Sequence, residues 1–129
     1  MDTQYATATV TTSARYTDLA DRPLAVALST EDAAEERGFN PFERMTCYAH
    51  RRWLHQCVSS PSHVVRVSGH RWCRRCECAV TVAVDELAGD LTLTCPRCGE
   101  MPPGPANRQV VRACRASLAA ASEARDHLA

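Results

Sequence analysis

The chain has 129 residues, and its 15 arginines balance 15 acidic residues without a single lysine. The hydrophobic fraction of 45% includes 20 alanines and no isoleucine, which excludes a large aliphatic core. A single domain with so thin a core usually needs a disulfide or a bound metal for stability. Because no stretch approaches the ~20 apolar residues of a membrane span, we expect no membrane partner.

Eight cysteines are many for a chain of this length. The N-terminal stretch MDTQYATATVTTSARYTD has no basic region followed by an apolar run, so we expect no secretory signal and a cytoplasmic location. Paired cysteines in a cytosolic chain favour metal binding over disulfides, with a redox role as a further alternative.

Residues 1–38 carry seven acids and three arginines, a net charge of −4, whereas residues 39–129 carry eight acids and twelve arginines, a net charge of +4. Residues 1 to about 17 lack useful periodicity and are predicted to be poorly ordered. Ser29 and Thr30 before EDAAEER, with Gly38 after it, predict a short helix, and the preceding LAVAL fits either a strand or a helix. We expect an acidic, partly disordered arm at 1–38 and a second domain with flanking helices at 39–129.

The segment MTCYAHRRWLHQC, residues 45–57, predicts a helix in which Cys47, His50, Leu54 and Cys57 share one face. On such a helix His55 points away from His50, so four ligands cannot converge from this segment alone. Packing of the cysteines as small hydrophobic residues is one interpretation. The alternative is a second metal site at Cys47, His50 and Cys57, completed by His63, His70 or Cys78.

The C-terminal half predicts strands followed by one long helix. HVVRVSGHRW, residues 63–72, alternates as a strand does, and ECAVTVAVDELAGDLTLT, residues 77–94, reads as a hairpin with its turn at DELAGD. Val80, Val82 and Val84 then share a face, as do Leu91 and Leu93. From Asn107 onward a helix places Val111, Cys114, Leu118 and Ala121 on an apolar stripe beside three arginines, Arg108, Arg112 and Arg115.

Two cysteine pairs have the spacing of a four-cysteine zinc site. Cys73-x2-Cys76 and Cys95-x2-Cys98 are separated by 18 residues, and the hairpin between them would bring two tight turns together. Pro96 and Gly99 favour the second turn, whereas Glu77 replaces the usual glycine in the first. Cys78 is a plausible substitute ligand.

This pattern resembles the zinc ribbon, a family in which two knuckles cap a three-stranded antiparallel sheet. The resemblance covers about residues 63–100 and implies an α+β fold with Cys73, Cys76, Cys95 and Cys98 as ligands of one structural Zn²⁺. Zinc ribbons occur in transcription factors, RNA polymerase subunits, ribosomal proteins and protein-docking modules. Iron is the alternative metal, because rubredoxin also uses a CPxCG knuckle.

The segment from Arg44 to Cys76 contains seven arginines, four histidines and no acids. Arginines neutralise phosphates and aromatic rings stack on unpaired bases. The candidate nucleic-acid contacts are Arg51, Arg52, Arg71, Arg74, Arg75, Trp53 and Trp72. A GC-rich genome, such as that of an actinobacterium or its phage, would also explain the use of arginine in place of lysine.

No catalytic constellation is evident: the chain contains no P-loop, GxGxxG or HExxH motif. We therefore expect a non-enzymatic zinc-ribbon accessory protein without a small-molecule substrate. Its expected partner is nucleic acid, or a ribonucleoprotein or polymerase complex of transcription or translation. A protein-interaction adaptor that docks through residues 18–38 and 107–128 is the alternative, and an iron or thiol redox protein is a further one.

Overall fold

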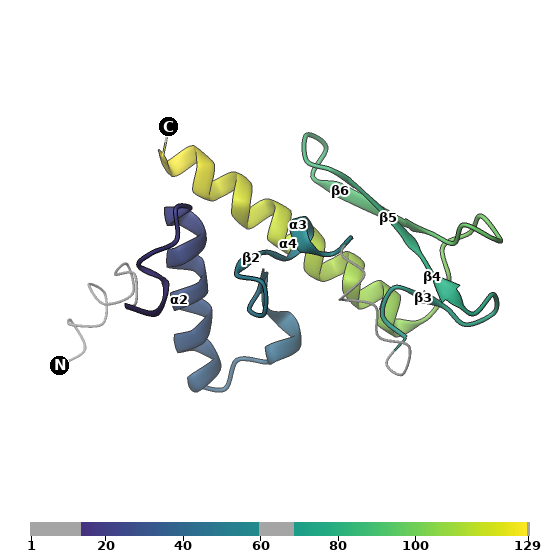
Figure 1. Ribbon diagram of the computed structural model, residues 1–129, viewed down its shortest axis with the longest axis horizontal. Helices are drawn as coiled ribbons and strands as arrows, with labels where there is room; N and C mark the ends of the chain where they lie inside the picture. The colour runs from purple at the N-terminus through teal and green to yellow at the C-terminus, as the bar shows by residue number, and fades with distance from the viewer. Residues whose placement is uncertain (1–13, 60–68, 129) are drawn as a thin grey trace.

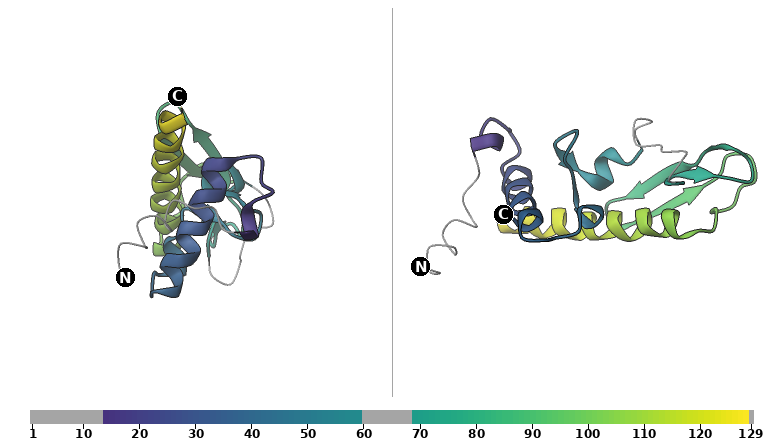
Figure 2. Two further views of the ribbon diagram at one scale, coloured as in Figure 1. Left: turned by 90° about the vertical axis from the view of Figure 1, so that its left-hand side faces the viewer. Right: turned by 90° about the horizontal axis from the view of Figure 1, so that it is seen from below.

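The computed structural model describes residues 14–59 and 69–128 as an elongated α+β arrangement along one long helix (Figure 1). That helix, α4 (Pro105–Leu128), has α2 (Arg22–Glu36) packed near its C-terminal end and the hairpin of β5 (Thr81–Asp85) and β6 (Asp90–Thr94) near its N-terminal end (Figure 2). Buried clusters lie along α4, so this helix is the support that both ends of the molecule share.

The strands form three separate antiparallel pairs among the described residues, so the predicted three-stranded sheet is wrong. β1 (Thr46–Cys47) pairs with β2 (Arg52–Trp53), β3 (Trp72–Cys73) pairs with β4 (Cys78–Ala79), and β5 pairs with β6. Two-residue pairs close tight turns and are too short to extend a sheet. Of the predicted strand at 63–72, residues 63–68 lie outside the described residues.

The predicted hairpin is confirmed, with Val82 opposite Leu93 and Val84 opposite Leu91. Leu91 and Leu93 are buried against α4, where they meet Val110 and Val111. The C-terminal helix is confirmed too: Cys114, Leu118 and Ala121 are buried, whereas Arg108, Arg112 and Arg115 are exposed. The 3.6-residue period of the apolar stripe therefore placed this helix correctly.

Helix α2 begins well before the predicted start at Ser29 and Thr30. The Asp21 side chain caps the helix by accepting from the Leu24 N–H at 3.0 Å, and Pro23 lies in the first turn. Thr30 lies inside the helix, where its hydroxyl donates to the Val26 carbonyl oxygen at 2.9 Å. The segment LAVAL is thus helical, and the predicted stop is confirmed by Gly38, whose φ is 104°.

Residues 14–17 are ordered, in contrast to the prediction for this part of the N-terminal region. Ala14–Tyr16 forms the 3₁₀ turn η1, and the fully buried Tyr16 hydroxyl donates to Asp32 at 2.5 Å. Burial and this carboxylate raise the pKa of Tyr16 to about 12. Tyr16 shares a buried cluster with Leu24, Trp53 and Ala121, so α2 belongs to the same core as β2 and α4. The division of the chain after Gly38 stays a prediction.

The Glu31 carboxylate joins α2 to the segment that carries β1. It is 8% exposed and accepts hydrogen bonds from the Met45 N–H, the Thr46 N–H and the Thr46 hydroxyl. Beside it, the buried Arg44 guanidinium pairs with Asp32 at 2.9 Å and with Glu35 at 3.4 Å, after the short turn η2 (Pro41–Glu43). Acids of the N-terminal region therefore accept hydrogen bonds from Met45 and Thr46 and neutralise the charge of Arg44.

We expect Glu31→Ala to lower the free energy of unfolding by about 3 kcal/mol, because it leaves buried N–H donors without an acceptor. Urea denaturation at constant metal concentration measures this loss. Glu36→Ala is the matched control, since Glu36 is exposed on the same helix, and we expect a change within about 0.5 kcal/mol. Equal stability of the two variants would show that the Glu31 contacts contribute nothing.

Candidate metal centre

Two tight turns place the predicted zinc ligands. In the first, Cys73 stands opposite Cys78 in the β3–β4 pair, and Glu77 adopts φ 52°. In the second, which follows β6, the Gly99 N–H donates to the Cys95 carbonyl oxygen at 2.8 Å and Gly99 adopts φ 75°. Counted from the first cysteine of each turn, the fifth residue has left-handed backbone, which is favourable for glycine and unfavourable for glutamate. Glu77 adopts this conformation nonetheless.

The four cysteines converge: one sulfur from each of Cys73, Cys76, Cys95 and Cys98 lies within 4.8 Å of all the others. A tetrahedral site with metal–sulfur bonds of about 2.3 Å has sulfur–sulfur edges of about 3.8 Å, so a small adjustment fits a metal ion. Cys73 and Cys95 are buried, and both pack beside Val80 and Leu93. The hairpin thus brings together two cysteine pairs that could hold a metal, as in a zinc-binding module.

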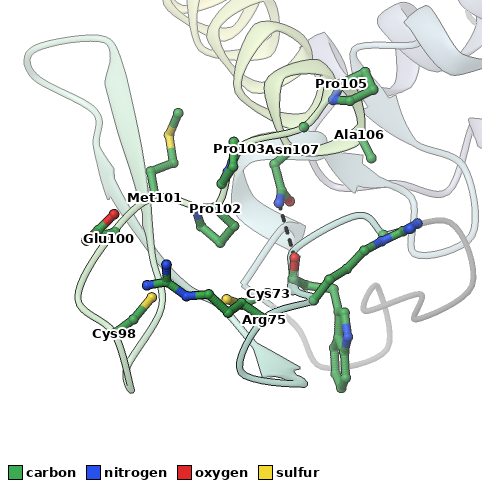
Figure 3. Close-up of a pocket in the computed structure, with 14 residues that line it drawn as sticks. Cys73, Arg75, Cys98, Glu100, Met101, Pro102, Pro103, Pro105, Ala106 and Asn107 are labelled. Carbon is green, nitrogen blue, oxygen red and sulfur yellow. Dashed lines mark hydrogen bonds between the residues drawn. The ribbon is translucent and has the colours of Figure 1, made fainter.

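Backbone and side-chain donors surround these sulfurs. Backbone N–H groups of Cys98 and Arg97 lower the pKa of Cys95 to about 6, and the Arg97 N–H lies 3.4 Å from that sulfur. Burial and hydrogen bonds to neighbouring cysteines raise the pKa of Cys76 to about 12. The Arg75 side chain reaches toward Cys98 (Figure 3), and this sulfur raises the pKa of the guanidinium. A metal that binds here must therefore displace protons from part of the set.

Cys78 lies next to the cluster without belonging to it. Its sulfur is 3.6 Å from the Cys95 sulfur, but the convergent set contains Cys76 in the first turn. Burial raises the pKa of Cys78, with the Cys95 hydrogen bond as a further cause. Cys76 therefore fits the candidate site better than Cys78, whose thiol lies beside it.

A pocket of about 510 Å³ opens beside the centre. Figure 3 shows Cys73, Arg75 and Cys98 on one side of it and the chain from Met101 to Asn107 on the other. Asn107 fixes the first knuckle to the start of α4, because its amide accepts from the Arg71 N–H at 2.8 Å and donates to the Trp72 carbonyl oxygen at 3.2 Å. The pocket thus lies between the cysteine cluster and the hydrogen-bonded start of α4.

Residues 45–57 do not form the predicted continuous helix. β1, a turn and β2 precede α3 (Leu54–Cys57), which has only four residues. The turn brings His50 back over Cys47, and α3 brings Cys57 to the same place, so the three predicted residues do converge. Two histidines were candidates to complete this group. His63 lies outside the described residues, and His70 Nε2 lies 3.4 Å from Gln109 Oε1.

The seven predicted nucleic-acid contacts fall into different environments. Arg51, Arg52, Arg74 and Arg75 are exposed, and Trp72 is half-buried. Trp53 is 5% exposed in the core cluster with Tyr16. Arg71 is 3% exposed, and its guanidinium donates to the Val58 carbonyl oxygen. Neither of these two buried side chains can reach a partner without rearrangement of the core.

The structure contains a buried histidine–serine pair that no sequence pattern indicated. His55 Nδ1 lies 2.8 Å from Ser117 Oγ, and the backbone N–H of His55 also donates to this oxygen at 3.3 Å. The two residues are separated by 62 positions, so only the packing of α3 on α4 reveals the pair. Burial lowers the pKa of His55. His55 is 2% exposed and Ser117 is 0% exposed, so a substrate cannot reach the pair. The pair instead connects α3 to α4.

Comparison with known proteins gives no significant match to a family model, a curated protein or a solved structure. Across residues 14–59 and 69–128, no helix is both long and apolar enough to cross a membrane.

We expect Cys76→Ser to lose one metal ion per chain and Cys78→Ser to keep the wild-type content, because only the Cys76 sulfur belongs to the convergent set. The two variants are matched, since both remove a half-buried thiol from the same turn. Inductively coupled plasma mass spectrometry of the desalted proteins gives the metal-to-chain ratio. Loss of metal from the Cys78 variant alone would make Cys78 the ligand.

Proposed function

We propose that the four-cysteine centre holds zinc, that the chain is a zinc-ribbon-like module, and that it binds nucleic acid or a nucleic-acid machine. Zinc suits a set of four thiolates, and a site closed by four protein ligands is structural because it keeps no position for water. The metal would therefore shape a binding surface, and the chain would act without catalysis.

The observation that carries this proposal is the combination of side chains at the pocket beside the metal centre. Exposed Arg74 and Arg75 line the same pocket as the half-buried Trp72. Guanidinium groups can neutralise phosphates, and an indole face can stack on an unpaired base. These neighbours favour a single strand over a duplex, because only unpaired bases offer a free face for stacking.

The charge balance limits the size of this contact. Glu77 and Glu100 lie near the cysteines of the proposed zinc site. Four thiolates around Zn²⁺ would add further negative charge. Arg75 partly offsets that charge through the Cys98 sulfur. With Arg51 and Arg52 included, four exposed arginines remain from the predicted set. We therefore expect a modest interface with few phosphate contacts.

We expect a labelled single-stranded oligonucleotide to bind with a slope of log affinity against log salt of about −3, as four phosphate contacts require. Fluorescence anisotropy between about 50 and about 200 mM salt measures this slope, with DNA, RNA and duplex compared. Arg74→Ala with Arg75→Ala should weaken binding about tenfold and halve the slope to about −1.4, because two of the four phosphate contacts are lost.

The charge-matched control for this experiment is Arg37→Ala with Arg125→Ala, because both residues are exposed away from the pocket. The control should keep the wild-type affinity within about twofold. Negligible binding of both DNA and RNA in low salt would reject direct contact with nucleic acid, and equal losses in the two double variants would reject this pocket.

A second candidate, a protein-interaction adaptor, is favoured by an open groove between α2 and α4. This groove, of about 580 Å³, is lined mainly by apolar side chains, among them Val26, Ala27, Met45 and Ala124. Residues of both expected docking segments, 18–38 and 107–128, line this groove.

If the chain is an adaptor, the wild type should retain a protein partner in a nuclease-treated pull-down. We expect Ala27→Arg to lose this partner, because the arginine places a charge in the groove. Thr30→Arg is the matched control, since Thr30 is exposed on the same helix and does not line the groove. A partner retained by both variants would place the contact elsewhere, and a partner removed by nuclease would favour nucleic acid.

A further inference from the structure

The turn after β1 repeats the backbone of the two turns that carry the four-cysteine centre. In each, two metal-binding residue types stand three positions apart and the next residue has positive φ: 54° at Arg51, 52° at Glu77 and 75° at Gly99. The Arg51 N–H donates to the Cys47 carbonyl oxygen at 2.7 Å, as the Gly99 N–H does to that of Cys95.

The strand register around the turn is repeated as well. Cys47 stands opposite Arg52, and Cys73 stands opposite Cys78, so both turns span the same number of residues between paired positions. Thr46 and Trp53 continue the first pair as Trp72 and Ala79 continue the second. Residues 47–51 are therefore a third knuckle, with histidine in place of the second cysteine.

The backbone conformation at Arg51, with φ 54°, is unfavourable for a residue that carries a Cβ. Within the described ranges only Arg51, Arg71 and Glu77 are non-glycine residues with positive φ. Two of these three follow a ligand pair directly. In the four-cysteine centre, Glu77 has positive φ directly after Cys73 and Cys76, whose sulfurs converge. Arg51 has the same conformation directly after Cys47 and His50, whose side chains also converge.

The side chains of the third knuckle meet a further cysteine. His50 Nδ1 lies 3.3 Å from the Cys47 sulfur and 3.0 Å from the Cys57 sulfur. In a tetrahedral zinc site these sulfur–nitrogen distances are about 3.6 Å. Cys47 and Cys57 are 5% and 1% exposed, whereas His50 lies at the surface. Simple packing of two cysteines would not require an exposed imidazole to turn its nitrogen toward both sulfurs.

We propose that Cys47, His50 and Cys57 bind a second zinc ion, independent of the four-cysteine centre. Two thiolates and an imidazole form a donor set that zinc accepts readily. The ion would join the knuckle at 47–51 to α3, a helix of four residues that is too short to be stable alone. It would thereby stabilise the part of the molecule that packs between α2 and α4.

Native mass spectrometry of the full-length chain, purified without chelator and supplied with zinc, tests this proposal by counting ions. We expect two zinc ions in the wild type and one in His50→Ala or in Cys57→Ser. His50→Cys should restore two, because it converts the third knuckle to the Cys-x2-Cys form of the others. Cys73→Ser with Cys76→Ser should keep the ion at the second site.

The matched control for the cysteine variants is Cys114→Ser, because Cys114 is buried and belongs to neither convergent set. It should keep both ions, which separates ligand loss from general destabilisation. His50 is exposed, so His50→Ala should leave the far-ultraviolet circular dichroism of the helices unchanged. A single zinc ion in the wild type, or unchanged zinc content in His50→Ala, would overturn the proposal. Because the ions are counted in the free protein, the outcome does not depend on nucleic-acid binding.

Discussion

Four cysteine sulfurs that approach one another within 4.8 Å form the constraint on which one end of this molecule depends. The surrounding core is small: Val80 and Leu93 pack on the cysteines, and Val110 and Val111 of α4 close the cluster. A structural zinc contributes of order 10–16 kcal/mol, which is comparable with the total stability of a typical domain. In a chain with 20 alanines and no isoleucine, a metal at this point would replace much of the missing aliphatic core.

The opposite end depends on charge compensation within the chain. Glu31, Asp32 and Glu35 of α2 lie around Arg44, and the Glu31 carboxylate accepts backbone hydrogen bonds in front of β1. Arg15 also pairs with Asp32. The acid-free segment that begins at Arg44 is thus partly neutralised by acids from earlier in the chain. Among the described residues of this segment, Arg51, Arg52, Arg74 and Arg75 remain exposed, and the proposed phosphate contact depends on them.

The same local conformation serves both ends of the molecule. A cysteine, two intervening residues, a second cysteine or a histidine, and a left-handed fifth residue form a compact turn that needs little core around it. Each such turn directs its side chains at cysteines outside the turn: Cys95 and Cys98 for the turn at Cys73, and Cys57 for the turn at Cys47. Helix α4 holds these clusters in line through contacts with β6 and α3. In residues 14–59 and 69–128, short turns packed on one long helix thus take the place of an extended sheet.

The sequence by itself determined the features with a regular period or a specific spacing. The valines and leucines of residues 80–93 alternate and indicated the hairpin, and the stripe of Cys114, Leu118 and Ala121 indicated α4. The two Cys-x2-Cys pairs indicated the candidate metal centre. Only the tertiary structure decided the conformation of residues 45–57, because ligands spaced three apart fit a helix and a knuckle equally well. It also decided that Arg71 is buried and Arg44 is paired, since both depend on contacts with residues distant in sequence. Local patterns report local geometry, whereas burial and charge compensation are properties of the packed chain.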